Sequence, residues 1–128
     1  MGDQLDKYEE QLVKGWEDMY KKGQLTLWIL LALHDGPKHM NDIKLFIAAQ
    51  TNDTLGADDK SMYRALRRYH AAEMIGFTTT PSQNGPDRKI YELTQVGQHV
   101  LVAFCKRNIT DVFYKSSVQN LIKKLGEL

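Results

Sequence analysis

A basic helical pattern runs directly into a hairpin pattern between residues 58 and 93, and this order limits the folds open to the chain. Residues 58–74 read DDKSMYRALRRYHAAEM, with apolar residues at three- and four-residue steps. At about 100° per residue, three cations fall opposite that apolar stripe. The stripe consists of Met62, Ala65, Leu66 and Tyr69, and the cations are Lys60, Arg64 and Arg67. Such a helix can pack on a core and face a phosphate backbone at the same time.

The residues that follow indicate two strands joined by a turn. Residues 75–80 and 88–93 are rich in β-branched and aromatic side chains, and Asn84-Gly85-Pro86 lies between them. Arg88 and Lys89 come just past the turn, where they could make a second contact with the same polyanion. A helix followed by a basic hairpin is the layout of a winged helix-turn-helix DNA-binding domain. Taken alone, the helix could instead be an ordinary packed helix whose cationic face is solvated.

The basic residues of the helix and the hairpin have two expected roles, reading bases and contacting phosphates. Arg64 and Arg67 are the best candidates for base edges in the major groove, because a guanidinium pairs bidentately with guanine. Phosphate contact is an equal alternative for either arginine alone. The expected phosphate contacts are Lys60, Ser61, Tyr63, Arg88 and Lys89. Tyr63 could instead bury its ring, and the two wing residues could also enter the minor groove.

Charge is distributed unevenly along a chain whose formal net charge is only +1. Residues 60–89 carry six basic and two acidic residues, whereas residues 1–22 carry four basic and six acidic residues. Cys105 is the single cysteine, which excludes an internal disulfide and suits a reducing cytosol. The longest apolar stretch, Leu25–Leu33, is too short to cross a bilayer, and no signal peptide is recognisable. We therefore expect a cytoplasmic protein with no membrane partner.

The remaining pattern predicts a mainly α fold in the order αααα-ββ-αα. The other helices are expected at 3–21, 24–34, 39–50, 95–107 and from about residue 111 onward. We expect an N-terminal dimerisation helix at 1–22, a winged helix-turn-helix domain at 23–94 and C-terminal dimerisation helices at 95–128. The terminal helices carry apolar stripes that must be covered. They could fold back on their own chain, but a symmetric dimer is favoured, because readers of two half-sites are usually dimers.

Three motifs between Gly23 and Gly97 resemble the PadR family of winged-helix transcriptional regulators. GQLTLWILLALHDGPKHMNDI is similar to the family's opening helix, Gly-Pro turn and second-helix start. KSMYRALRRYHAAEMI is similar to its Ser-Leu-Tyr-x-Ala-Leu-x-x-Leu pattern. GPDRKIYELTQVG follows the wing motif Gly-Pro-x-Arg-Lys-x-Tyr-x-Leu-Thr-x-x-Gly almost throughout. The last motif is long and without gaps, so it is the most specific of the three.

The resemblance implies a dimeric repressor that binds a palindromic operator and is released by a small aromatic or cationic effector near the dimer interface. Trp16 and Trp28 are candidates for stacking on such a ligand, with ordinary core packing as the alternative. The chain departs from the family pattern at four positions: Met40, Asn41, Arg64 and Glu73. Glu73 replaces a Gly that commonly ends the basic helix, so we expect that helix to end differently, since Glu resists a left-handed cap.

Two other functions are alternatives to DNA binding: an enzyme and a protein-interaction module. An enzyme is not expected: the four histidines fit no metal template, and no phosphate-binding loop or nucleophile motif is recognisable. The sequence likewise calls for no metal or cofactor. A winged-helix module that binds proteins instead of DNA is the second alternative. That reading predicts the loss of basic residues from the helix and hairpin, whereas here they are present.

Overall fold

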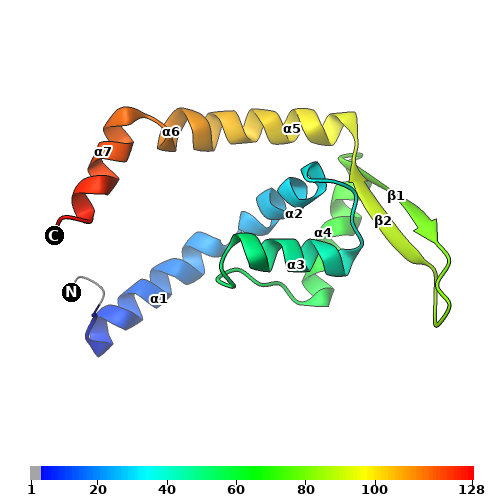
Figure 1. The fold of residues 1–128 in the computed structure, drawn as a ribbon, viewed down its shortest axis with the longest axis horizontal. Helices are drawn as coiled ribbons and strands as arrows, with labels where there is room; N and C mark the ends of the chain where they lie inside the picture. The colour runs from blue at the N-terminus through cyan, green and yellow to red at the C-terminus, as the bar shows by residue number, and fades with distance from the viewer. Residues whose placement is uncertain (1–3) are drawn as a thin grey trace. The chain divides into compact units, whose positions relative to one another are not determined.

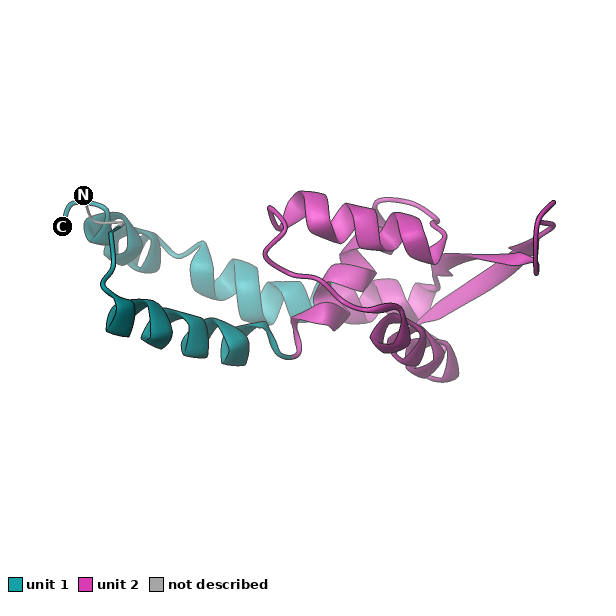
Figure 2. Cartoon of the chain, turned by 90° about the horizontal axis from the view of Figure 1, so that it is seen from below, with its two compact units in different colours: residues 1–22, 102–128 teal, residues 23–101 magenta. Residues whose placement is uncertain are grey.

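The computed structural model describes residues 4–128, which divide into two compact units. One unit comprises residues 23–101, and the other combines the chain up to Lys22 with residues 102–128 (Figure 2). Helix α5 (Gln95–Cys105) begins in the first of these units and ends in the second. Each unit is described by itself.

The 23–101 unit is a winged helix-turn-helix, as the sequence predicted (Figure 1). Helices α2 (Gln24–His34), α3 (Met40–Gln50) and α4 (Asp59–Ala71) precede a hairpin of β1 (Ile75–Thr80) and β2 (Arg88–Leu93). Apolar side chains from every one of these elements form the core. The largest fully buried ones are Ile29, Ile43, Met62, Leu66 and Ile75. Helix α2 buries four residues and is the central helix, in agreement with its nearly continuous apolar sequence.

The two strands pair antiparallel, with Ile75 opposite Leu93 and Thr80 opposite Arg88. Lys38 adds a single rung on the other edge of β2. Its N–H donates to the carbonyl oxygen of Tyr91 at 3.0 Å, and the Tyr91 N–H donates back to Lys38 at 2.9 Å. The base of the hairpin is therefore bonded along both edges of β2.

The prediction for the end of α4 was wrong. The helix was expected to reach Met74, but it ends at Ala71, and Glu73 adopts φ +63°. Glutamate thus takes the left-handed conformation that the sequence argument expected it to resist. Thr94 is hydrogen-bonded to this turn, because its Oγ1 donates to the Glu73 carbonyl oxygen at 2.5 Å. This tertiary contact offers a physical reason for the difference.

Helix α5 begins at Gln95, as the sequence predicted. The Thr94 hydroxyl accepts the Gly97 N–H at 3.1 Å, which caps the first turn. Gly97 then lies against the backbone at the end of α4. A Cβ at this position would overlap the Met74 carbonyl oxygen and lie 2.9 Å from its carbonyl carbon. Only glycine permits this close approach between α5 and the residue that leads into β1.

The terminal helices differ from their predicted bounds. Helix α1 spans Lys7–Lys21 instead of starting at residue 3, because Asp6 and Glu9 form a reciprocal capping box. Residues 1–3 lie outside the described residues. Helix α5 continues as a π-helical turn, η1 (Lys106–Thr110), and the last predicted helix is divided into α6 (Asp111–Phe113) and α7 (Ser116–Leu125). Helices α1 and α7 bury no residue within this chain.

Candidate nucleic-acid interface

The amino end of α4 is fixed by two aspartates. Asp58 is the N-cap, and its side chain accepts the Ser61 N–H at 2.7 Å. That backbone hydrogen bond, with smaller contributions from Arg64 and Lys60, lowers the pKa of the Asp58 carboxyl. Asp59 forms an ion pair with Lys44 of α3, with 2.5 Å between Oδ1 and Nζ. The first turn of α4 is thereby tied to the preceding helix of the helix-turn-helix.

The two faces of α4 lie as the helical pattern predicted. Met62, Ala65, Leu66 and Tyr69 are buried in the core. Lys60, Arg64 and Arg67 are all exposed. Tyr63 is 48 % exposed, so its ring is not part of the core. Ser61 is half-buried at the start of the helix, and its N–H is already used by the Asp58 cap.

Arg88 and Lys89 are both exposed, but they lie on opposite faces of the hairpin. Successive residues of a strand alternate between faces, and directly opposed residues share one. Lys89 pairs with Thr79. The next pair on the same face of the hairpin is Phe77 and Tyr91. The Lys89 ammonium lies 4.4 Å from the centroid of the Phe77 ring. The sequence predicted one wing contact from the two cations together, whereas the register places them on opposite faces of β2.

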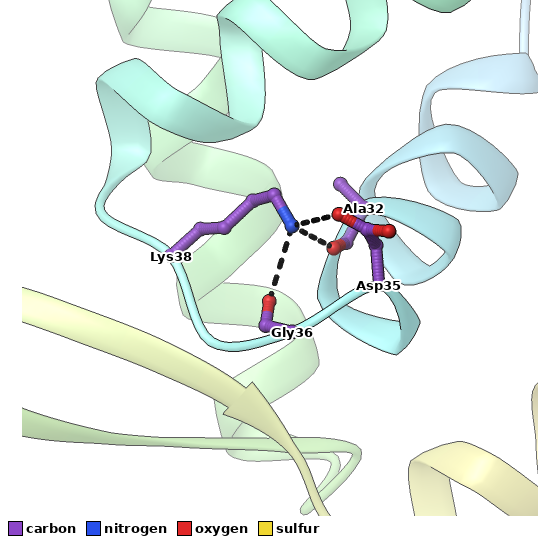
Figure 3. Close-up of polar contacts among 4 residues, drawn as sticks. All are labelled: Ala32, Asp35, Gly36 and Lys38. Carbon is purple, nitrogen blue, oxygen red and sulfur yellow. Dashed lines mark hydrogen bonds and ion pairs between the residues drawn. The ribbon is translucent and has the colours of Figure 1, made fainter.

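Lys38 anchors the segment that bonds to the wing, and the sequence analysis did not single it out. Its ammonium donates to the Ala32 carbonyl at 2.8 Å, the Asp35 carboxylate at 2.9 Å and the Gly36 carbonyl at 3.3 Å (Figure 3). The side chain is only 14 % exposed, and its ammonium lies 5.0 Å from the centroid of the Phe46 ring. A cation at the carboxyl end of α2 also complements the helix dipole.

His39 continues this attachment. Its ring Nδ1 donates to the Lys89 carbonyl oxygen at 3.0 Å. Lys38 and His39 therefore hold β2 at two residues, Tyr91 and Lys89, and fix the wing against the start of α3. The partners are about fifty residues apart in the chain, so no local pattern could have revealed the contact. The only sequence signal was Gly36-Pro37, which marks a turn between α2 and α3.

Two hollows lie between the helices and the wing. The larger, of about 360 Å³, lies between the start of α3, α4 and β2, and its lining includes Asp59 and Asp87 beside Arg88 and Lys89. The smaller, of about 240 Å³, lies between α4 and the hairpin, where Arg67 and Lys89 line it without a carboxylate. Arg64 lines neither hollow. The structure thus brings Arg67 and Lys89 to one groove and leaves Arg64 outside it.

The remaining sequence candidates lie elsewhere. Trp16 is 74 % exposed on α1, whereas Trp28 is half-buried in α2. Cys105 is half-buried, and this burial raises the pKa of its thiol. Within residues 4–128, no group of three His, Cys, Asp or Glu side chains could hold a metal ion. No helix in that range is long and apolar enough to cross a membrane.

Comparison with known proteins places this architecture among transcription factors. The model of the transcriptional regulator PadR-like family matches residues 29–103. A search of curated proteins found no match. Bacillus subtilis PadR, solved in complex with operator DNA, is 25 % identical with a TM-score of 0.57. That match covers 62 % of this chain and only 45 % of the Bacillus subtilis chain, so the chain spans less than half of that relative.

Two further solved structures resemble most of the chain. A PadR family transcriptional regulator from Eggerthella lenta has a TM-score of 0.63 at 17 % identity, covering 94 % of this chain and 96 % of that one. A PadR-like transcriptional regulator from Bacillus cereus has a TM-score of 0.61 at 24 % identity, covering 79 % and 93 % respectively. At these identities the two likenesses establish the fold.

Proposed function

Because the chain belongs to the PadR-like family of transcriptional regulators, we propose that it binds double-stranded DNA through α4 and the wing. The observation that carries this proposal is the exposed cationic face of α4, formed by Lys60, Arg64 and Arg67. Lys89 of the wing lines a groove with the last of these cations. Basic side chains on a second element beside a helix that can enter the major groove are what a phosphate backbone requires.

Each of these residues has a proposed role. Arg64 enters the major groove and reads a guanine, since it is exposed on α4 and is in no ion pair within residues 4–128. Lys60, Ser61 and Tyr63 contact phosphates near the amino end of α4, where the helix dipole also favours an anion. Arg88 contacts DNA from the opposite face of the wing to Lys89. The N–H of Ser61 is used by Asp58, so the expected phosphate contact would be made by its hydroxyl.

The protein acts as a homodimer on a palindromic operator, and its output is repression. Support for the dimer comes from the terminal helices, where large apolar side chains are exposed on this chain. They include Leu12, Trp16, Met19, Leu121, Ile122 and Leu125. Exposed apolar faces of this kind mark protein–protein interfaces. Bacillus subtilis PadR, the relative solved with operator DNA, supports the operator as the target.

A small aromatic or cationic effector releases the operator. Trp16 offers an exposed indole for stacking, and Trp28 a half-buried one. Titration of small aromatic acids and amines, followed by tryptophan fluorescence, tests this part. The Trp16→Phe and Trp28→Phe variants assign any signal to one indole. A panel that changes neither the emission nor operator affinity would remove the effector from the proposal.

Selection of bound duplexes from a random DNA pool tests the function as a whole. The expected product is a palindrome whose half-site spacing gives the dimer geometry. Fluorescence anisotropy on that duplex then measures affinity as salt is varied. If six to ten phosphates are neutralised, the log–log slope is expected to lie at roughly −5 to −9. A pool that shows no enrichment, or a slope near zero on the selected duplex, would favour the protein-interaction module instead.

A further inference from the structure

The groove between α4 and the wing has a positive charge that nothing in its lining balances. Arg67 enters it from α4 and Lys89 from β2, and no aspartate or glutamate lines it. Neither cation forms an ion pair within residues 4–128. Four other lysines are paired with carboxylates, including Lys44 with Asp59 on the neighbouring helix. What distinguishes the groove is that its lining holds two cations outside these ion pairs and no carboxylate.

Aromatic rings line the wing side of the groove, and one of them lies beside Lys89. The Lys89 ammonium lies 4.4 Å from the centroid of the Phe77 ring, and Phe77 packs beside Tyr91 with 5.9 Å between ring centroids. Tyr91 is only 5 % exposed. Burial raises the pKa of its hydroxyl, while the positive charge of Arg67 acts in the opposite direction. Arg67 and Tyr91 both line the groove.

Two like charges that line one groove repel each other, and a shared anion removes that cost. A phosphodiester fits the arrangement, because it carries one negative charge and two unesterified oxygens, so that it accepts hydrogen bonds from two directions at once. The rings of Phe77 and Tyr91 also exclude water from one side of the groove, which strengthens the attraction.

We propose that Arg67 and Lys89 together bind one DNA phosphate in the groove between α4 and the wing. Arg67 then positions the duplex, and base reading on α4 is left to Arg64. A phosphate held from both elements at once would fix the angle between the recognition helix and the wing on the DNA. This inference rests on the proposed DNA-binding function and adds which two residues share one phosphate.

Neutral backbone substitution can locate that phosphate. The probe is the duplex selected from the random pool, in which each phosphate of one half-site is replaced in turn by an uncharged methylphosphonate. For the unmodified protein, replacement of the shared phosphate is expected to weaken binding about tenfold, the scale of a charge-assisted hydrogen bond. The variants Arg67→Gln and Lys89→Gln should each lose most of that sensitivity, and both should lose it at the same phosphate.

The control is Arg68→Gln, one residue along α4. The Arg68 guanidinium lies 5.3 Å from the Tyr69 ring centroid and outside the groove, so its variant should keep the full interference pattern. Thermal melts confirm that the variants are folded. If Arg67→Gln and Lys89→Gln lose sensitivity at different phosphates, or Arg67→Gln relaxes base preference instead, the shared phosphate is refuted while DNA binding stands. If no duplex is ever selected, the DNA-binding function itself fails.

Discussion

Lys38 shows how a single side chain positions a functional element from outside the interface. Its ammonium satisfies three oxygens at the end of α2 while its backbone pairs with Tyr91 of the wing. A change at Lys38 therefore affects the end of one helix and the attachment of the hairpin together.

We expect Lys38→Met to reduce the free energy of unfolding by about 1–3 kcal/mol, because the Ala32 carbonyl loses a charged donor in a part-buried site. Urea denaturation followed by circular dichroism measures the change. Lys60→Met is the matched control, since Lys60 is exposed and should stay within about 0.5 kcal/mol of the parent. Equal stability of the two variants would mean that the Lys38 contacts contribute nothing net.

At Glu73 we predict a substitution that stabilises the fold. Its φ of +63° is strained for any residue with a Cβ, and glycine removes that strain. Glu73→Gly should therefore raise the free energy of unfolding by roughly 0.5–1 kcal/mol, despite the greater entropy of the unfolded chain. Glu92→Gly, in β2 where φ is negative, should lower it by a similar amount. Destabilisation by both substitutions would show that Glu73 makes a compensating contribution.

At the scale of elements, helix α4 was the part best predicted from sequence. Its buried and exposed faces follow from the 3.6-residue repeat alone, so Met62 and Arg64 lie where the pattern placed them. Its end was not predictable, because Glu73 is held by Thr94, which lies 21 residues further along the chain. Alternation along β2 could have separated Arg88 from Lys89. Which of their faces meets α4 depends on tertiary packing, as does the attachment through Lys38.

Arg64 allows the role of α4 in base reading to be measured. We expect Arg64→Ala to weaken operator binding by about 1–3 kcal/mol and to relax the preference at one base pair per half-site. Anisotropy with the selected duplex and with each single-base variant of it gives both quantities. Lys60→Ala is the comparison, and it should weaken all duplexes alike. If Arg64→Ala also weakens them all alike, Arg64 contacts a phosphate.

At the scale of the whole molecule, we predict from the terminal helices an assembly larger than one chain. Trp16 is 74 % exposed and Leu121 63 % exposed, in helices that bury no residue within the chain. Sedimentation equilibrium at micromolar concentration should give about twice the chain mass of 14.7 kDa. Leu121→Glu should shift the equilibrium toward monomer, since it puts a charge into an apolar interface, whereas Gln119→Glu should not. A monomeric parent that still binds the palindrome tightly would contradict the dimer.

We expect the backbone pair between Lys38 and Tyr91 to divide the wing into a base that opens rarely and a tip that opens often. Near Tyr91, strand β2 is bonded on both sides, to β1 and to Lys38. His39 also holds the Lys89 carbonyl, but beyond it, at Thr80 and Arg88, the strands of the described chain are bonded to each other alone. A two-stranded ribbon by itself is marginally stable in water. Amide hydrogen exchange should therefore be slow at Lys38 and Tyr91 and fast at the tip. If the wing contacts DNA as proposed, a base that stays closed while the tip opens and recloses would allow it to follow local variation in the width of a DNA groove without loosening the fold that carries it.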